Sequence, residues 1–424
     1  MLASSISPSA SPSGASRGKV RLFDISRVTL VSALLLLGGV ISLCPLLDVF
    51  LPIKSNIIAL GSAAAIVLIR IDWYAINRKL VALIVLLLAT GGISATYWGE
   101  HRMMLIPIYV ISGALAISVV RRRDVDAFVT LLTWLTMGML IGAIIALFYA
   151  YAGGPSLFAF TNRDGRLVQV YLTTLTNSQY QNFIRPSGLF DEPGALSFVI
   201  CCIAALRHTL GYDKKVTWTM LLLGLVTTSL AHLLYIVVHA IDELSGSKHM
   251  MKALVVATMV AAALYAIVTF VQPIQEIYSN LLMVKFAVSD GRLVGDNRTD
   301  LSLNAASYID ATSFWFGINA RCAVGFCDWM GQGYAPFGEN PLTLLVQWGL
   351  LISFPYYLSL AYLGTVALLR RSLIPLGVLL LLLQRPYTMS FGYSVLILLT
   401  IAVVARKVPE GPAERAPAHS AMAE

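Results

Sequence analysis

Charged residues are scarce in this chain. Only 12% of its 424 residues are Asp, Glu, Lys or Arg, whereas 58% are hydrophobic. A soluble fold is excluded, because soluble proteins carry about 25% charged residues and could not bury this much apolar surface. Uncharged runs such as Val31–Val40, Val81–Thr90 and Leu376–Leu383 recur from residue 28 to residue 405. Since a bilayer core needs about 20 apolar residues per helix, the sequence predicts an all-α polytopic membrane protein.

Signatures of metal and nucleotide chemistry are also lacking. The sequence has no H-E-x-x-H, no Walker-type Gly-Lys-Ser/Thr loop and no D-x-D cluster in the predicted external loops. We therefore expect no cofactor and no metal ligand. The net charge of +8 is interpreted as basic flanks of membrane helices, the positive-inside pattern, so we expect a lipid bilayer and no nucleic acid as partner.

Cysteine is rare, with five residues in the chain. Cys44, Cys201 and Cys202 lie in apolar segments and are interpreted as small hydrophobic residues. Cys322 and Cys327 share an external loop, where an oxidising compartment would favour a disulfide between them; two free thiols is the alternative.

Apolar runs predict the membrane spans. They cover 28–51, 53–69, 80–97, 103–120, 126–152, 193–206, 216–241, 252–272, 340–369, 372–384 and 388–405. The run 216–241 is interrupted at Thr227, Thr228 and Ser229. We interpret it as two short helices hinged near Ser229, which gives about 12 crossings.

The charges support this hairpin. Arg207, Lys214 and Lys215 precede the run, and Lys248 and Lys252 follow it. Two crossings keep both groups cytoplasmic, whereas one crossing would place the later charges outside, against the positive-inside rule.

The predicted organisation follows the chain as disordered cytoplasmic tail (1–27), transmembrane helices 1–5 (28–152), first periplasmic loop (153–192), helices 6–9 (193–272), second periplasmic loop (273–339), helices 10–12 (340–405) and cytoplasmic tail (406–424).

The first candidate segment is R-P-S-G-L-F-D-E-P-G-A-L-S-F, residues 185–198, where the first loop re-enters the membrane. Asp191 and Glu192 precede Pro193, a favoured first residue of a helix. An ordinary helix cap explains these acids, and Arg185 at an interface can simply reach lipid phosphate. The same arrangement also creates an anion site, since a helix N-terminus beside an Arg favours phosphate.

The second candidate segment is Y-A-P-F-G-E-N-P-L-T-L-L-V-Q-W-G-L-L, residues 334–351, where the second loop re-enters. Asn340 is a natural N-cap and Pro341 a first-turn residue. Glu339 beside this start is either a carboxylate next to the cap or a partly desolvated general base. Spacing alone does not separate the two.

Together these segments resemble the O-antigen polymerase and O-antigen ligase superfamily of bacterial membrane glycosyltransferases. The similar features are R-P-S-G-L-F-D-E-P-G opening a helix, the Thr-Thr-Ser break, the long second loop, and E-N-P-L-x-x-L-L-x-x-x-G-L opening the next helix, over about residues 150–355. The resemblance implies metal-independent transfer of a glycan from an undecaprenyl diphosphate carrier, on the periplasmic face of the bacterial inner membrane.

In that reaction arginines would stabilise the leaving diphosphate by charge-assisted hydrogen bonds. The resemblance places Arg185 first. The further candidates for binding diphosphate or sugar are Arg298, Arg292, Arg321, Arg385, Asp191, Glu192 and Asn340.

One position departs from the superfamily, since many of its ligases have His-Asn where this chain has Glu339-Asn340. Glu339 is therefore expected as the base, with His232 and His101 as alternatives. A lone histidine in an apolar helix is more often a hydrogen-bonded core residue than a catalyst. The missing histidine favours a polymerase, which joins lipid-linked repeat units. The expected partners are then the undecaprenyl diphosphate-linked oligosaccharide and a protein that regulates chain length.

Two other functions stay open. A ligase would transfer the glycan to lipid A core or protein by the same donor chemistry. A transporter or lipid flippase would need ionisable groups within the membrane, and the predicted spans have almost none apart from His232 and His239. Sugar identity, linkage, stereochemical course, product length and oligomeric state cannot be predicted from the sequence.

Overall fold

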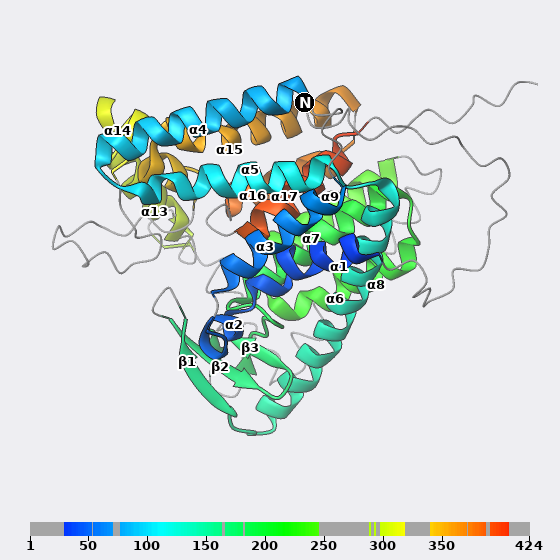
Figure 1. Cartoon of the computed structure of the whole chain (residues 1–424). Helices are drawn as coiled ribbons and strands as arrows, with labels where there is room; N and C mark the ends of the chain where they lie inside the picture. The colour runs from blue at the N-terminus through cyan, green and yellow to red at the C-terminus, as the bar shows by residue number, and fades with distance from the viewer. Residues whose placement is uncertain are drawn as a thin grey trace, which may run out of the picture.

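The computed structural model describes residues 29–52, 54–70, 77–162, 166–180, 183–245, 288–289, 292–293, 297–318, 340–370, 372–386 and 391–406. The fold is mostly helical, as expected (Figure 1). Its helices are α1 (Leu30–Gly39), α2 (Pro45–Phe50), α3 (Ser55–Arg70), α4 (Arg78–Trp98), α5 (Leu105–Ser118), α6 (Arg122–Tyr151), α7 (Pro193–Leu210), α8 (Lys214–Leu223), α9 (Leu230–Ser245), α13 (Asn297–Ser307), α14 (Ala311–Phe316), α15 (Thr343–Arg370), α16 (Ile374–Gln384) and α17 (Phe391–Val404).

Five helices are long and apolar enough to cross a membrane, not the predicted twelve. They are Arg78–Trp98, His101–Ser118, Arg122–Tyr151, Pro193–Leu210 and Thr343–Arg370; shorter apolar helices cover Leu30–Leu43, Ser55–Arg70, Ile374–Gln384 and Phe391–Val404. This count applies to the described ranges, which do not include the predicted span 252–272. These long apolar helices indicate that the molecule is a membrane protein.

The number of crossings predicted from the apolar runs is too high, because several helices end before the apolar run that contains them ends. The run 28–51 is divided at Val40 into α1, a short 3₁₀ turn and α2, with Pro45 as the first residue of α2. Proline lacks the N–H that would continue the preceding helix. Hydropathy alone does not detect such a break.

The fold is also not purely helical. In the first predicted loop, β1 (Phe158–Thr161), β2 (Leu167–Tyr171) and β3 (Thr174–Thr176) form an antiparallel sheet, and β4 (Gln179–Tyr180) pairs with β5 (Phe183–Ile184). Val168 and Val170 on β2 are buried. This alternation over a short segment of β-branched and aromatic residues is typical of a half-buried strand, so the all-α prediction is wrong for this loop.

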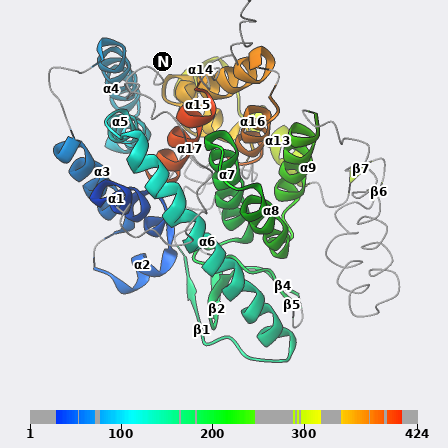
Figure 2. The same ribbon diagram turned by 90° about the vertical axis from the view of Figure 1, so that its right-hand side faces the viewer.

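The centre of the helical array consists of α7 and α17, whose residues are almost all buried. α17 packs against α1, α5 and α7, while α15 packs against α4, α14 and α16. α6 runs from this array towards the sheet of β1–β3 (Figures 1 and 2). With 30 residues α6 is about 45 Å long, which exceeds a bilayer core of about 30 Å.

The chain folds back at the predicted break near Ser229. α8 ends in a 3₁₀ turn (Gly224–Thr227), Thr228 adopts a left-handed backbone with φ of 47°, and α9 follows. The two helices are antiparallel, because Nζ of Lys214, the first residue of α8, lies 3.6 Å from Oε2 of Glu243 near the end of α9. Trp218 Nε1, midway along α8, donates to the same oxygen at 3.1 Å.

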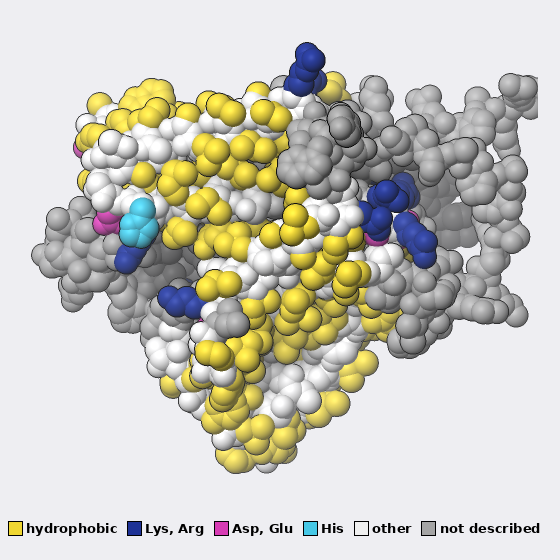
Figure 3. All heavy atoms as spheres, in the orientation of Figure 1, with side chains coloured by type: hydrophobic (Ala, Val, Ile, Leu, Met, Phe, Trp, Pro, Cys, Tyr) yellow, Lys and Arg dark blue, Asp and Glu magenta, His cyan; other side chains and the backbone are white. Residues whose placement is uncertain are grey.

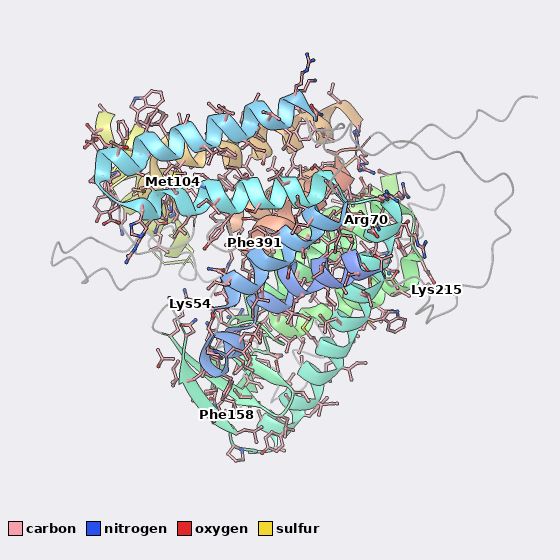
Figure 4. All side chains as sticks on the ribbon, in the orientation of Figure 1. Lys54, Arg70, Met104, Phe158, Lys215 and Phe391 are labelled. Carbon is pink, nitrogen blue, oxygen red and sulfur yellow. The ribbon has the colours of Figure 1, made fainter. Side chains whose placement is uncertain are left out.

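Basic side chains gather at one end of the array, which we call the basic end and define by Arg70, Arg122, Lys214, Arg370 and Arg406. Arg70 pairs with Asp124 at 3.1 Å, and Arg370 donates to the carbonyl of Val404 at 3.0 Å. Figure 4 shows Arg70 and Lys215 on one side of the molecule, and Lys54 and Met104 on the other. Apolar side chains cover much of the face seen in Figure 3, and the exposed apolar residues include Leu68 and Val85, as expected for a lipid-facing surface.

Candidate functional site: an arginine cluster at the start of helix α7

The segment that begins at Arg185 is held rigidly before α7 begins. Ser187 Oγ lies 2.7 Å from the carbonyl oxygen of Leu175 and 2.5 Å from that of Phe190, and these two oxygens share its one hydroxyl hydrogen. Gly188 has a φ of 62°, a left-handed conformation that glycine adopts without strain, and its N–H donates to Thr174 Oγ1 at 2.8 Å. The sheet therefore anchors the turn at Gly188.

Arg185 connects this segment to the break between α8 and α9. Its Nε donates to Thr228 Oγ1 at 2.6 Å, and its Nη2 donates to the carbonyls of Thr227 and Thr228 at 3.2 and 3.3 Å. Burial, with a further contribution from Arg385, lowers the pKa of Arg185 below its usual value. Two cations in a partly buried environment favour an anion close by.

Glu192 forms ion pairs with two further arginines, Arg166 and Arg385. It occupies the N-cap position of α7, but its side chain makes no cap hydrogen bond. Instead, its carboxylate pairs with Arg166 Nη1 at 3.1 Å and with Arg385. The ordinary-cap interpretation of Glu192 is therefore replaced by one carboxylate between two guanidinium groups.

Arg385 lies against the first turn of α7. A Cβ at Gly194 would be 2.9 Å from Arg385 Cζ, so glycine at this position leaves room for the guanidinium. The N-terminus of a helix carries a partial positive charge. Arg385 adds a full charge to it, and Glu192 offsets only part of this positive field.

Asp191 is directed to the sheet. It accepts a 3.0 Å hydrogen bond from Asn162 Nδ2, and Asn162 Oδ1 accepts from the backbone N–H of Arg166 at 2.9 Å. Asp191 therefore helps to position the residue that carries the Arg166 side chain. We define the arginine cluster as Arg166, Arg185 and Arg385 with their carboxylate, Glu192.

Asn340 lies at a different junction, between α13 and α15. Its Oδ1 accepts from the N–H of Leu342 at 2.8 Å, its N–H donates to Thr343 Oγ1 at 3.0 Å, and its Nδ2 donates to the Leu301 carbonyl at 3.4 Å. Asn340 thus caps the helix start, as its sequence position suggested. The preceding residue, Glu339, lies outside the described residues.

His232 lies in the protein core. It is fully buried, its Nε2 is 2.8 Å from the Leu221 carbonyl, and its Nδ1 is 3.5 Å from Cys201 Sγ. These contacts suit the structural interpretation of a core histidine. His101, the other alternative base, is exposed at the start of the short helix that precedes α5.

The remaining predicted residues are described only in part. Arg292 lies in β7 (Arg292–Leu293), which pairs with β6 (Val288–Ser289), and Arg298 lies in α13; their backbone alone is described. Arg321 and the predicted disulfide pair Cys322 and Cys327 lie outside the described residues.

Two groups of residues were not singled out from the sequence. Arg166 gave no signal beyond being a loop cation, and only the fold brings it to Glu192. His208, His239 and Glu243 also come together, with ligand atoms within 4.8 Å of one another. His239 and Glu243 are spaced i, i+4 on α9, which was the one available signal.

No family model matches the chain, and no curated protein matches it.

Proposed function

We propose that the protein is a membrane glycosyltransferase of the polymerase type, which transfers a glycan from an undecaprenyl diphosphate carrier to a sugar hydroxyl of a second lipid-linked repeat unit. One observation supports this most directly: Arg166 and Arg385 pair with the same carboxylate, and Arg385 also lies close enough to Arg185 to lower its pKa. The sequence resemblance described above motivates the choice of substrate.

The arginine cluster suits a lipid diphosphate for a reason of charge. Its three guanidinium groups outnumber the single carboxylate that pairs with two of them, and the cluster lies at the N-terminus of α7. Each phosphate of a diphosphate presents non-bridging oxygens that can accept two parallel hydrogen bonds from one planar guanidinium. Arginines can therefore stabilise the charge that develops on the leaving group.

Its position also suits a lipid-borne substrate. The cluster lies where the first loop meets α7, a long apolar helix, so an isoprenoid chain could remain in the bilayer while its diphosphate reaches the guanidiniums. The proposed side of the membrane is the outer one, since the clustered arginines of the basic end suit the cytoplasmic face.

In the proposed reaction, the bond between the anomeric carbon and the phosphate oxygen breaks, and undecaprenyl diphosphate leaves. A new bond forms between that carbon and the acceptor oxygen, whose proton passes to a base. The sequence makes Glu339 the first choice for this base. Arg185, fixed by Thr227 and Thr228, would contact the leaving group.

Purified protein in nanodiscs, supplied with an undecaprenyl diphosphate-linked oligosaccharide, tests the proposal. We expect longer glycans and release of undecaprenyl diphosphate. Arg166→Ala, Arg185→Ala and Arg385→Ala should each reduce the rate by about 100-fold or more, as loss of a charged transition-state contact does. The matched control is Arg102→Ala, because Arg102 is an exposed arginine outside the cluster.

Two results would contradict the proposal. One is full activity in all three cluster variants; the other is an equal loss in Arg102→Ala. Transfer of glycan to lipid A core, with no lengthening of the lipid-linked chain, would instead identify a ligase. Counterflow of the lipid-linked glycan with no new glycosidic bond would identify a carrier.

A further inference from the structure

A second cluster of polar side chains lies at the opposite end of α7, at the basic end. His208 comes from the last turn of α7, while His239 and Glu243 come from one face of α9. Their ligand atoms lie within 4.8 Å of one another. The proposed glycan transfer makes no use of these residues.

His239 is the unexplained member of this cluster. Its side chain is fully buried, yet neither ring nitrogen has a hydrogen-bond partner among the described residues. Aromatic rings of Trp218 and Tyr235 pack around it, with centroids 5.4 and 5.9 Å away. A buried imidazole without a hydrogen-bond partner destabilises the folded protein, so a ligand at its nitrogen would remove that cost.

The nitrogen and oxygen atoms are spaced as metal ligands are. Glu243 Oε1 lies 3.6 Å from His239 Nε2 and 3.7 Å from His208 Nδ1. Ligands of a tetrahedral zinc ion, with bonds of about 2.0–2.1 Å, lie about 3.3 Å apart. Both distances are longer than a hydrogen bond. Side-chain movements of a few tenths of an ångström would bring these atoms to the spacing of zinc ligands.

The surrounding contacts orient each proposed ligand atom. His208 Nε2 lies 3.1 Å from Asp242 Oδ2, which leaves Nδ1 to face the cluster. Asp242 is itself fixed by Ser372 Oγ at 3.1 Å and the N–H of Leu373 at 2.5 Å. A carboxylate that receives the second N–H of a histidine ligand is a recurrent feature of zinc sites.

Glu243 is oriented in the same way. Its Oε2 accepts the 3.1 Å hydrogen bond from Trp218 Nε1 and lies 3.6 Å from Lys214 Nζ. Oε1 is the oxygen that faces both histidines. Lys214 is 69% exposed, so its ammonium can move into solvent when a cation occupies the site.

We propose that His208, His239 and Glu243 bind a divalent transition-metal ion, with zinc as the best fit, which links the end of α7 to α9. Two imidazoles and one carboxylate are a three-residue ligand set that zinc accepts together with a water molecule. A network of ion pairs around a protonated His208 is the competing explanation. It accounts for Asp242 and Glu243, but among the described residues it leaves both ring nitrogens of His239 without a hydrogen bond.

Metal titration of the full chain tests this proposal. The protein is purified in detergent with an affinity tag that lacks histidine, treated with a chelator and titrated with Co²⁺ and Zn²⁺. We expect one Co²⁺ per chain, with the visible absorption of a tetrahedral ion, and its displacement by Zn²⁺. Zinc should also raise the unfolding temperature, since a ligand that binds only the folded state stabilises it.

Variants then assign the ligands. His208→Ala, His239→Ala and Glu243→Gln should each lower metal affinity at least about 100-fold. Trp218→Phe removes the hydrogen bond that orients Glu243 and keeps an aromatic ring beside His239, so it should lower the affinity about 10-fold. His101→Ala is the matched control, because His101 is an exposed histidine outside the cluster, and its affinity should equal that of the wild type.

The outcome does not depend on glycan transfer. A wild-type protein that binds no Co²⁺ or Zn²⁺ above background would overturn the proposal, whether or not any variant folds. So would an unchanged affinity in both His208→Ala and Glu243→Gln. If His239→Ala does not fold, these two variants still decide the result, since His208 and Glu243 are partly exposed.

Discussion

The Nε of Arg185 donates a 2.6 Å hydrogen bond to the Oγ1 of Thr228. This contact joins the turn before α7 to the break between α8 and α9. It therefore couples a guanidinium of the arginine cluster to a backbone conformation elsewhere in the chain. The proposed role of Arg185 depends on this support, because its side chain would otherwise be free to adopt other rotamers.

Replacing Thr228 tests this support. Thr228→Val removes the hydroxyl at nearly constant volume and should lower glycan transfer by about 10-fold, in line with the loss of one hydrogen bond to a charged group. Thr228→Ser keeps the hydroxyl and should retain most of the activity. The rate of chain lengthening in nanodiscs is the measurement. Equal rates for the two variants would show that the hydroxyl does not position Arg185.

Replacing Glu192 tests how much its ion pairs with Arg166 and Arg385 stabilise the fold. Glu192→Gln leaves Arg166 and Arg385 without their shared carboxylate, so we expect the free energy of unfolding to fall by about 1.5–3 kcal/mol, the usual range for hydrogen bonds to charged groups. Thermal unfolding in detergent measures the change. The double variant with Arg166→Gln should lose less than the sum of the single losses. Strict additivity would mean that the two side chains do not interact.

Gly349 tests the packing of α14 on α15. This residue interrupts α15 with a φ of 70°, and a Cβ there would lie 2.2 Å from the Trp315 carbonyl oxygen. Gly349→Ala should therefore lower the unfolding free energy by about 2 kcal/mol or more, through backbone strain and steric conflict.

Gly61→Ala is the control for this substitution. Gly61 lies within α3, and a Cβ there would meet no atom within 4 Å. Alanine is preferred to glycine in helices by about 1 kcal/mol, so this variant should be as stable as the wild type or slightly more stable. A comparable loss in both variants would argue against the kink at Gly349.

The orientation in the membrane is open to a labelling experiment. His101 and Lys215 are exposed. His101 shares a short 3₁₀ helix with Met104, and Figure 4 shows Met104 and Lys215 on opposite sides of the molecule, so His101→Cys and Lys215→Cys place thiols at opposite sides. We expect an impermeant maleimide to label the cysteine at position 101 in intact cells, and the one at position 215 only after permeabilisation, with the parent chain as background. Labelling of both from the same side would contradict the proposed topology.

Local features of the fold could be predicted from the sequence. The apolar runs indicated a helical membrane protein, Pro193 marked the start of α7, Asn340 marked the cap before α15, and the Thr-Thr-Ser stretch marked the break before α9. Each of these depends on residues within a few positions of one another. Hydrophobicity, caps and turn residues act at that range, so a single sequence contains them.

The number of long helices and the membership of the two clusters depend on the tertiary structure. Val40 and Pro45 divide an apolar run that hydropathy treats as one span. Arg166 and Arg385 meet at Glu192 only because the sheet and α16 are packed around α7. His208 likewise reaches Glu243 only through the packing of α7 against α9. Charged side chains far apart in sequence leave no periodic signal, so which of them pair is decided by the packing of the helices.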